Sequence, residues 1–527
     1  MGMKFATVTR EGQYVKNAGI PQEVLYFTML QTRMVFIRSA GINLAKACTI
    51  TIRYSAVRQQ GYDANKPKSK EELSVLDYQT QQYRLFPLLA AAYAIVLTGN
   101  RVDDFAAALS EQTKRGDVSL LTVGHVMSCG LKVFTTDLAT AGIETARRAC
   151  GGHGYLLSSG LPILLGDAVQ TVTTEGDNLV LSVQTARALL KILGSMKKTG
   201  KVPEPMAFLT NIDKQSNATP RTKQQWLEPQ TYVVAFEQRF LYQLRSYVKK
   251  ISTETSVTAG LQNNSMDTLK LTNSYASLVI VKTFAEVVQG SSTLTSEFLS
   301  SPAVLNVVRL LCHLFALTQL EATAAEFMES GCVFPSEMPI IRANIEELLA
   351  LIRPHAVALV DGFNFSDHTL NSTLGRYDGN VYEALYESAQ HDPLNHSSDK
   401  VALHELLRPI RDEISQSRLY KNNVEKIERL EQLLVQDPLF NHEKMNYLTR
   451  GEQYKRAMQM AGRAEIIARR NKLNEEDTAL LHLVLQGFTS CPSSTALHTG
   501  MFFKNLGLLF SDEQQTKWME MAKQWRM

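Results

Sequence analysis

The sequence has few cysteines for its length, and none of them falls into a familiar arrangement. Six cysteines occur in 527 residues, with no CxxC pair and no regular spacing, at positions 48, 129, 150, 312, 332 and 491. This usage argues against a disulfide framework or a zinc site. It favours free, mostly buried thiols in a reducing compartment. His313 and His355 lie in apolar helical contexts, where we expect hydrogen-bonded core histidines and no metal ligands.

Net charge and long apolar runs are also scarce. The formal net charge of +3 is too small over this length to indicate nucleic acid or an anionic membrane as a partner. Charged or polar residues interrupt the apolar runs before the roughly 20 residues that a membrane span requires, so we expect no membrane partner. Residues 1–4 lead into a polar segment, with no visible secretory signal. The length and the ordinary hydrophobic content of 44% indicate a globular protein with more than one domain.

Strand patterns are almost absent. Only residues 3–16 alternate, with a turn at Glu11-Gly12, and they read as the end of a β-rich region. Helical periodicity dominates the rest, and it predicts a first set of long helices at 21–60, 76–97, 119–148 and directly after Glu175. Long helices joined by short loops are typical of an antiparallel bundle.

A second set of helices is expected beyond a linker. Residues 195–223 contain Pro203, Pro205 and Pro220 and read as this linker. The helical patterns that follow lie at 224–251, 266–289, 302–330 and 339–351. The sequence therefore predicts a mainly α fold: a helical bundle, a second helical bundle and a helical C-terminal extension. The expected divisions of the chain are 1–20, 21–200, 201–419 and 420–527.

The residues that suggest chemistry lie in one stretch, which begins with a glycine cluster at 151–154. Backbone without Cβ atoms can approach a ligand closely and offer its amides to phosphate oxygens. Glu175 follows, just ahead of an amphipathic helix that Asp177 or Asn178 can cap and that Gly194 can end. From spacing alone, two interpretations stay open. One is a carboxylate base beside a phosphate-bearing ligand, and the other is a capped helix after an ordinary glycine turn.

Several longer motifs, in order along the chain, resemble one family. They are Lys46–Ile50, Arg53–Arg58, Leu76–Tyr83, Cys150–Tyr155, Thr174–Asn178, Gln184–Arg187 and Leu374–Tyr382. In these segments the chain is similar to the peroxisomal acyl-CoA oxidases, flavoenzymes related to the acyl-CoA dehydrogenases. The resemblance implies an acyl-CoA dehydrogenase-like helical bundle, FAD as cofactor, fatty acyl-CoA as substrate and the peroxisome as location.

The resemblance also implies a reaction and a set of site residues. In the family, fatty acyl-CoA is desaturated to trans-2-enoyl-CoA, the flavin takes up the hydride, and oxygen reoxidises the flavin to give hydrogen peroxide. The resemblance assigns the role of catalytic base to Glu175. It assigns FAD contacts to Arg58, Gln79, Gly151, Gly152 and Asp177, and acyl-CoA contacts to Tyr26, Thr28, Met29, Arg33 and Thr174.

Simpler interpretations of some of these residues stay open. Arg58 can be a solvated arginine at a helix end, and Gln81 and Gln82 can be surface residues. Phe27 stands where the family has glycine, which can narrow the acyl tunnel. Phe27 and Met29 can equally be core residues packed between helices.

The order of the family segments is unusual. Asp437–Phe440, Tyr447–Arg450 and Leu497–Phe502 resemble the N-terminal part of an acyl-CoA oxidase. The order therefore suggests the back part of one oxidase followed by the front of another, with the central β-barrel domain missing. Ser417–Leu419 resembles a peroxisomal targeting tripeptide, which we expect not to act as an address inside a chain.

Two hypotheses about function follow. The first is an acyl-CoA oxidase, or its catalytic helical half, that works with FAD in a homodimer. The second is a non-catalytic oxidase-like partner, or an incomplete chain, that forms a heterodimer with an intact paralogue.

Overall fold

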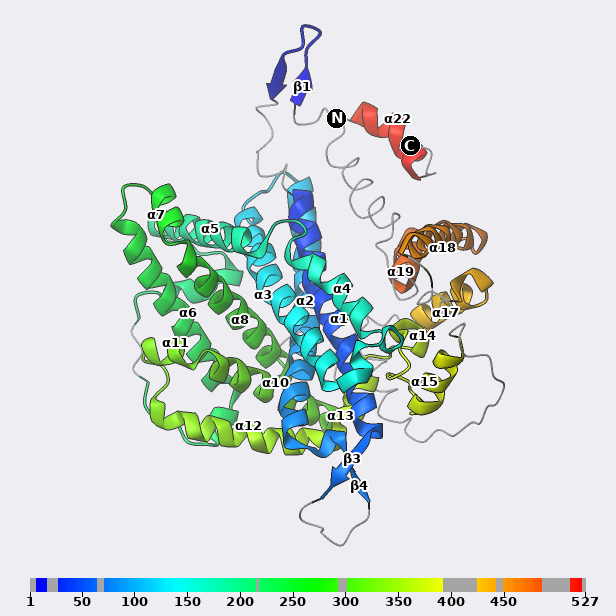
Figure 1. Ribbon diagram of the computed structural model, residues 1–527. Coiled ribbons are helices and arrows are strands. Elements are labelled where there is room, and N and C mark those ends of the chain that lie inside the picture. Colours follow the sequence, from blue (N-terminus) through cyan, green and yellow to red (C-terminus); the bar gives the residue numbers. More distant parts are fainter. Residues whose placement is uncertain are drawn as a thin grey trace.

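The structure, a computed structural model, describes residues 6–16, 27–63, 71–214, 218–291, 301–391, 424–441, 448, 450–485 and 512–523 (Figure 1). Tyr26, Cys491, Ser417–Leu419, Tyr447 and Leu497–Phe502 lie outside these residues. The described part is mainly helical, which confirms the predicted fold class.

The first bundle contains α1 (Phe27–Val57), α2 (Gln79–Lys114), α3 (Leu121–Ala149), α4 (Leu161–Val169) and α5 (Asn178–Thr199). Gly41 of α1 lies against Val96 of α2, and Gly99 of α2 lies against Arg38 of α1, so these two helices run antiparallel. Helix α3 lies alongside α1 and runs in the same direction, because Gly124 of α3 lies near Leu30 and Gly142 lies near Leu44. Consecutive long helices therefore alternate in direction, as expected for long helices joined by short loops.

The second set of helices packs on the first. It contains α6 (Pro229–Ser252), α7 (Val257–Asn263), α8 (Ser265–Val288), α10 (Pro302–Ala322), α11 (Ala324–Glu329), α12 (Met338–Ile352), α13 (Ala356–Asp361), α14 (Asp367–Leu370) and α15 (Val381–Gln390). Tyr275 of α8 contacts α3 at Gly130, where a Cβ would come within 2.9 Å of the ring. One hydrophobic core runs through both sets, from Phe27 to Val381.

Strands form two short pairs. β1 (Ala6–Val8) and β2 (Tyr14–Lys16) are antiparallel, which confirms the strand pair expected at 3–16. The pair formed by β3 (Gln59–Tyr62) and β4 (Glu72–Ser74) was not predicted. No sheet among the described residues has more than two strands.

Two predicted helix ends were wrong. The helix predicted at 76–97 extends to Lys114, with Pro87 in its third turn. Gly194 does not end α5, which continues to Thr199 and stops at Gly200, where φ is +69°. A glycine inside a helix costs only about 1 kcal/mol, which the buried face of α5 can outweigh.

The expectation that no apolar segment is long enough to span a membrane was also wrong. Four helices in the described part of the chain are long and apolar enough to cross a membrane, by length and composition alone. They are α1, α2, α5 and α10. Scattered polar residues interrupt their apolar runs without lowering mean hydropathy enough to exclude them. In the fold these helices pack on one another, and 83% of the most apolar window of α2 is buried.

The C-terminal segment has a separate small core. It contains α17 (Val424–Val435), α18 (Arg450–Arg470) and α19 (Glu475–Leu485), and α22 (Asp512–Lys523) follows. Leu430, Met460 and Leu481 are completely buried among these helices. The segment is joined to the main body through Glu431, whose carboxylate accepts hydrogen bonds from the hydroxyls of Ser366 and Thr369.

The end of the linker is held by one buried acid. Glu337 is 1% exposed, and its carboxylate accepts hydrogen bonds from the backbone and Nε of Arg221, from Trp226 Nε1 and from the Phe334 amide. The Arg221 guanidinium also stacks on the Trp226 ring, 4.2 Å from its centroid. A buried ion pair with this many additional donors fixes the linker against the second set of helices.

Removing this acid should destabilise the fold. Glu337→Ala leaves the Arg221 guanidinium and three further donors (the Arg221 and Phe334 amides and Trp226 Nε1) without their acceptor, so we expect a loss of about 3 kcal/mol. Urea unfolding followed by tryptophan fluorescence measures the change. The control Glu347→Ala removes a half-exposed partner of Lys223 and should cost at most about 0.5 kcal/mol. Equal losses of unfolding free energy in the two variants would contradict the view that burial makes Glu337 important.

Candidate functional site

Glu175 lies on a tight turn between α4 and α5. It is half-buried, and it adopts a left-handed backbone conformation with φ of +58°, followed by Gly176 with φ of +117°. Left-handed backbone disfavours a side chain with a Cβ, so a glutamate in this conformation requires support from its surroundings. Gly176 is packed against Leu181, where an added Cβ would come within 2.9 Å of the leucine side chain.

Two buried cations from different helices support the turn. Arg33 of α1 donates from Nε to the Glu175 carbonyl oxygen at 2.9 Å. Lys132 of α3 donates from Nζ to the Gly176 carbonyl oxygen at 2.9 Å and to Asn178 Oδ1 at 2.8 Å. The Asn178 amide donates in turn to Asp137 Oδ1 at 2.8 Å. Successive carbonyls of the turn are thus each held by a charged donor.

The structure shows which of the two residues proposed as the cap of α5 has this role. Asp177 is exposed, and its carboxylate accepts a hydrogen bond from the Leu179 amide at 2.9 Å, so Asp177 caps α5. Asn178 is 6% exposed and belongs to the network under the turn.

Burial shifts the protonation of the groups under the turn. It lowers the pKa of the Lys132 ammonium to about 8. Burial, and then the positive charge of Arg33, lowers the pKa of His125 to about 4. A ring nitrogen of His125 lies 3.9 Å from the Cys129 sulfur, and Arg33 Nη1 donates to the same sulfur at 3.6 Å. The His125 imidazole is therefore neutral, in a cluster that already contains the cations Arg33 and Lys132.

Most of the residues assigned to the acyl side lie at this end of α1. Thr28 and Arg33 are buried, Met29 is half-buried, and Thr174 is exposed with its hydroxyl donating to the Gln170 carbonyl at 2.8 Å. Phe27 is 2% exposed and packs in the core.

The residues assigned to FAD, except Asp177, lie at the opposite end of α1. Arg58 follows the last turn of α1 and donates to Gln60 Oε1 at 3.0 Å and to the Tyr382 hydroxyl at 3.4 Å. Gln79 is exposed at the start of α2. By contrast, Gln81 and Gln82 are buried and not surface residues. Gln81 bonds to Ser55 Oγ and to the Ala149 carbonyl.

The glycine cluster follows the end of α3, beside the Arg58 end of α1. Gly154 packs so closely that an added Cβ would come within 2.0 Å of the Arg147 carbonyl oxygen, so its role is structural. Gly151, with φ of +61°, and Gly152 face open space, since no atom lies within 4 Å of an added Cβ. Their backbone is therefore open to a ligand or a second chain.

The predicted site residues thus form two groups. Arg33 lies in the second turn of α1, and Arg58 directly follows its last turn, so a rise of about 1.5 Å per residue separates the two by roughly 37 Å. The base group contains Glu175, Asp177, Thr174, Thr28, Met29 and Arg33. The flavin group contains Arg58, Gln79, Gly151 and Gly152.

Sequence reasoning missed Lys132 and His125, and it considered Asn178 only as a cap. The available signal was weak. Lys132 interrupts a stretch of α3 in which Leu131, Val133 and their neighbours are buried. A charge on a predicted buried face is the only local indication of a network.

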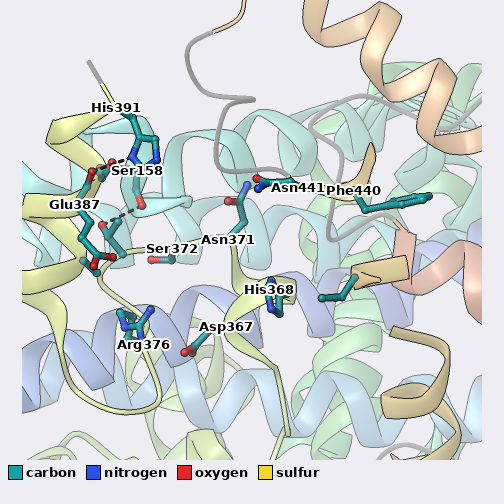
Figure 2. A pocket seen from close by; sticks show the side chains of 14 residues that line it. Ser158, Asp367, His368, Asn371, Ser372, Arg376, Glu387, His391, Phe440 and Asn441 are labelled. Carbon is teal, nitrogen blue, oxygen red and sulfur yellow. Dashed lines mark hydrogen bonds between the residues drawn. The ribbon is translucent and has the colours of Figure 1, made fainter. Parts of the chain in front are cut away.

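A separate cavity of about 280 Å³ lies between α14, α15 and the C-terminal segment, and it contains none of the predicted site residues (Figure 2). Arg376 and Glu387 both line it. Arg376 pairs with Asp378, and Asp367 accepts the Tyr377 amide at 2.8 Å. The Leu374–Tyr382 motif is therefore fixed by its own polar contacts.

Three family models match the chain in succession. The model for the acyl-CoA oxidase C-alpha1 domain matches residues 26–190, the acyl-CoA oxidase model matches 228–412, and the model for the acyl-coenzyme A oxidase N-terminal region matches 419–527. The model described as N-terminal thus matches the last part of this chain.

Known proteins with related sequences and structures are acyl-CoA oxidases. The peroxisomal acyl-coenzyme A oxidase 1 of Rattus norvegicus is 37% identical over 424 residues, which are 79% of this chain and 62% of the relative. The crystal structure of an acyl-CoA oxidase from tomato is 34% identical with a TM-score of 0.69, and covers 76% of this chain and 60% of its own. The Caenorhabditis elegans acyl-CoA oxidase-2, solved with FAD, ascaroside-CoA and ATP, is 31% identical with a TM-score of 0.65, and covers 75% and 57%. The chain spans about three fifths of the length of these relatives.

The neutral His125 should make stability depend on pH. Its pKa falls from 6.5 to about 4 on folding, so between these values the unfolded chain binds a proton that the folded protein rejects. The stability that neutral His125 provides is complete above pH 6.5 and is lost as the pH falls toward 4. Urea unfolding midpoints of the wild type should therefore fall more steeply over this window than those of His125→Leu. Parallel curves would contradict the shift.

Proposed function

Since the chain belongs to the acyl-CoA oxidase family, we propose that it acts in the FAD-dependent desaturation of fatty acyl-CoA to trans-2-enoyl-CoA, with oxygen as acceptor and hydrogen peroxide as product. The observation that carries the proposal is that the backbone of Glu175 is held while its carboxylate is left available. Its backbone is fixed by Arg33, while its carboxylate makes no hydrogen bond or ion pair with any residue that the structure describes. A carboxylate held in this way is available as a base.

Glu175 removes the proton from the α-carbon of the thioester. One carboxylate oxygen accepts that proton, the electron pair of the C–H bond forms the new double bond, and a hydride leaves the β-carbon. FAD, when bound, supplies the acceptor for that hydride. The α-proton is a weak acid, so the rate depends on how closely the base is placed. Thr28, Met29 and Thr174, which lie at the same end of α1, are proposed to line the acyl side.

The second group of residues fits a phosphate-bearing cofactor such as FAD. Gly151 and Gly152 leave open backbone, and Arg58 brings a guanidinium that can pair with a phosphate. Gln79, exposed at the start of α2, is proposed to contact the adenosine part, and Asp177 is proposed to contact the cofactor from the base group.

The distance between the two groups supports a dimer. Base and hydride acceptor must lie on opposite faces of the same substrate carbons, yet within one chain Arg33, which holds the Glu175 backbone, is separated from Arg58 by roughly 37 Å along α1. We therefore propose that one chain supplies Glu175 and a second chain supplies Arg58, Gly151 and Gly152 to each site. The names of the relatives further support the peroxisome as the location.

Loss of the carboxylate should abolish turnover without loss of binding. Glu175→Gln keeps the size of the side chain but cannot accept the α-proton, so we expect the rate of acyl-CoA oxidation to fall at least about a hundredfold. Flavin absorbance and acyl-CoA titration should match the wild type, as should all properties of the control Glu329→Gln on the exposed face of α11. A Glu175→Gln enzyme with more than half the wild-type rate would reject Glu175 as the base. A wild-type chain that binds no flavin would instead favour the non-catalytic partner.

Mixed dimers test the shared site. Glu175→Gln and Arg58→Glu chains should each be inactive alone. Co-expressed in equal amounts, they should recover about a quarter of the wild-type rate, because half of the dimers are mixed and each has one intact site of two. Oxidation of acyl-CoA by the purified mixture measures the recovery. Mixed dimers without activity would indicate that each site is built from a single chain.

A further inference from the structure

The proposed reaction makes no use of a lysine that lies beneath the turn that carries Glu175. Lys132 is completely buried within α3. Its ammonium group donates to the Gly176 carbonyl at 2.9 Å and to Asn178 Oδ1 at 2.8 Å. The Asn178 amide then donates back to α3, to Asp137 Oδ1 at 2.8 Å and to Thr136 Oγ1 at 3.0 Å. One ammonium therefore ties the turn both to α3 and to the first residue of α5.

The turn that carries Glu175 requires a contact from α3. The Glu175–Gly176 peptide is held at both ends, since Arg33 of α1 donates to its carbonyl and its amide donates to the Thr173 carbonyl at 3.2 Å. The next peptide carries the Gly176 carbonyl, to which Lys132 donates. With left-handed backbone at both Glu175 and Gly176, small rotations of this peptide re-aim the glutamate side chain. The contact from Lys132 to the Gly176 carbonyl is the one that restrains this peptide from the side of α3.

Stability alone does not explain a lysine at this position. Methionine has a similar length and would fill the space without desolvating an ammonium group, and replacing buried charges by apolar side chains is often neutral or stabilising. Burial lowers the pKa of Lys132 to about 8, which reflects how strongly the folded protein disfavours this charge. The carboxylates of Asp137, which Asn178 links to the ammonium, and of Asp177 attract this charge, but burial outweighs them.

We propose that Lys132 is a positioning residue for the catalytic base. By holding the Gly176 carbonyl and the Asn178 side chain, it fixes the direction in which the Glu175 carboxylate leaves the turn. The catalytic part of this proposal rests on the proposed function, because it requires Glu175 to be the base. Removal of a proton from carbon is sensitive to placement, and an error of about 1 Å in a reacting group can cost on the order of a hundredfold in rate.

Hydrogen exchange on the full-length chain tests the holding role without any need for activity. In Lys132→Met, the amides of Gly176 and Leu179 should exchange at least about tenfold faster than in the wild type, because a bond from a charged donor is lost. The matched control Lys282→Met removes a partly exposed lysine of α8 and should leave these amides unchanged. Unchanged exchange in Lys132→Met would overturn the proposal. If Lys132→Met does not fold, Lys132→Gln, which keeps a donor without the charge, replaces it.

Kinetics of the FAD-loaded full chain tests the catalytic consequence. Lys132→Met should lower kcat about tenfold or more while KM changes less than about threefold, and Lys132→Arg, which keeps a charged donor, should recover part of the loss. A rise in KM alone, or a normal kcat in a chain whose turn exchanges rapidly, would overturn the proposal. If the wild type does not oxidise acyl-CoA, the proposed function fails, and the exchange result by itself decides whether Lys132 holds the turn.

Discussion

Close packing along α1 fixes the positions of everything that this chain brings to the proposed chemistry. Gly41 and Gly99 lie where α1 crosses α2, and Gly142 lies where α3 meets α1. At each of these glycines an added Cβ would come within 3.0 Å of the neighbouring helix, so the helices cannot slide or rotate without opening a close-packed core. Because Arg33 lies near the start of α1 and Arg58 directly follows its last turn, this rigid helix holds the groups built around them apart. The division of the site follows directly from this packing.

The fold was predictable where each helix carries a regular apolar stripe, and less so where packing uses glycine. The bundle helices and the second set were found from periodicity alone. The prediction for α2 stopped at residue 97 because Gly99 and the polar residues after it break the pattern. In the structure Gly99 is the point at which α2 touches Arg38, so a residue that resembles a helix breaker is a means of close approach. The pair β3 and β4 was missed because β3, with the sequence Gln-Gln-Gly-Tyr, has no alternation of apolar and polar residues.

The candidate site was predictable only in its local features. A glutamate before a capped helix and an Asp177 cap can be found in a few consecutive residues. The network that holds the turn cannot, because Lys132 is 44 positions from Gly176 and 46 from Asn178. The position of Lys132 on a predicted buried face is a weak indication, because a lysine there can also extend its charge into solvent along α3. The same limit applies to Gln81, whose partners are on α1 and at the end of α3.

The two ends of α1 are built in different ways, and the difference matches what each end is proposed to bind. At the Glu175 end, buried cations hold the backbone through bonds of 2.9 Å, so the position of the base is set when the chain folds. At the Arg58 end, the guanidinium is partly exposed, its bond to Tyr382 is 3.4 Å long, and two glycines face open space. A base for a weak carbon acid gains rate only from being placed before the substrate arrives. A cofactor with charged phosphates brings enough binding energy of its own to order a loosely held arginine. Rigidity is therefore concentrated at the end where the proposed reaction depends on it.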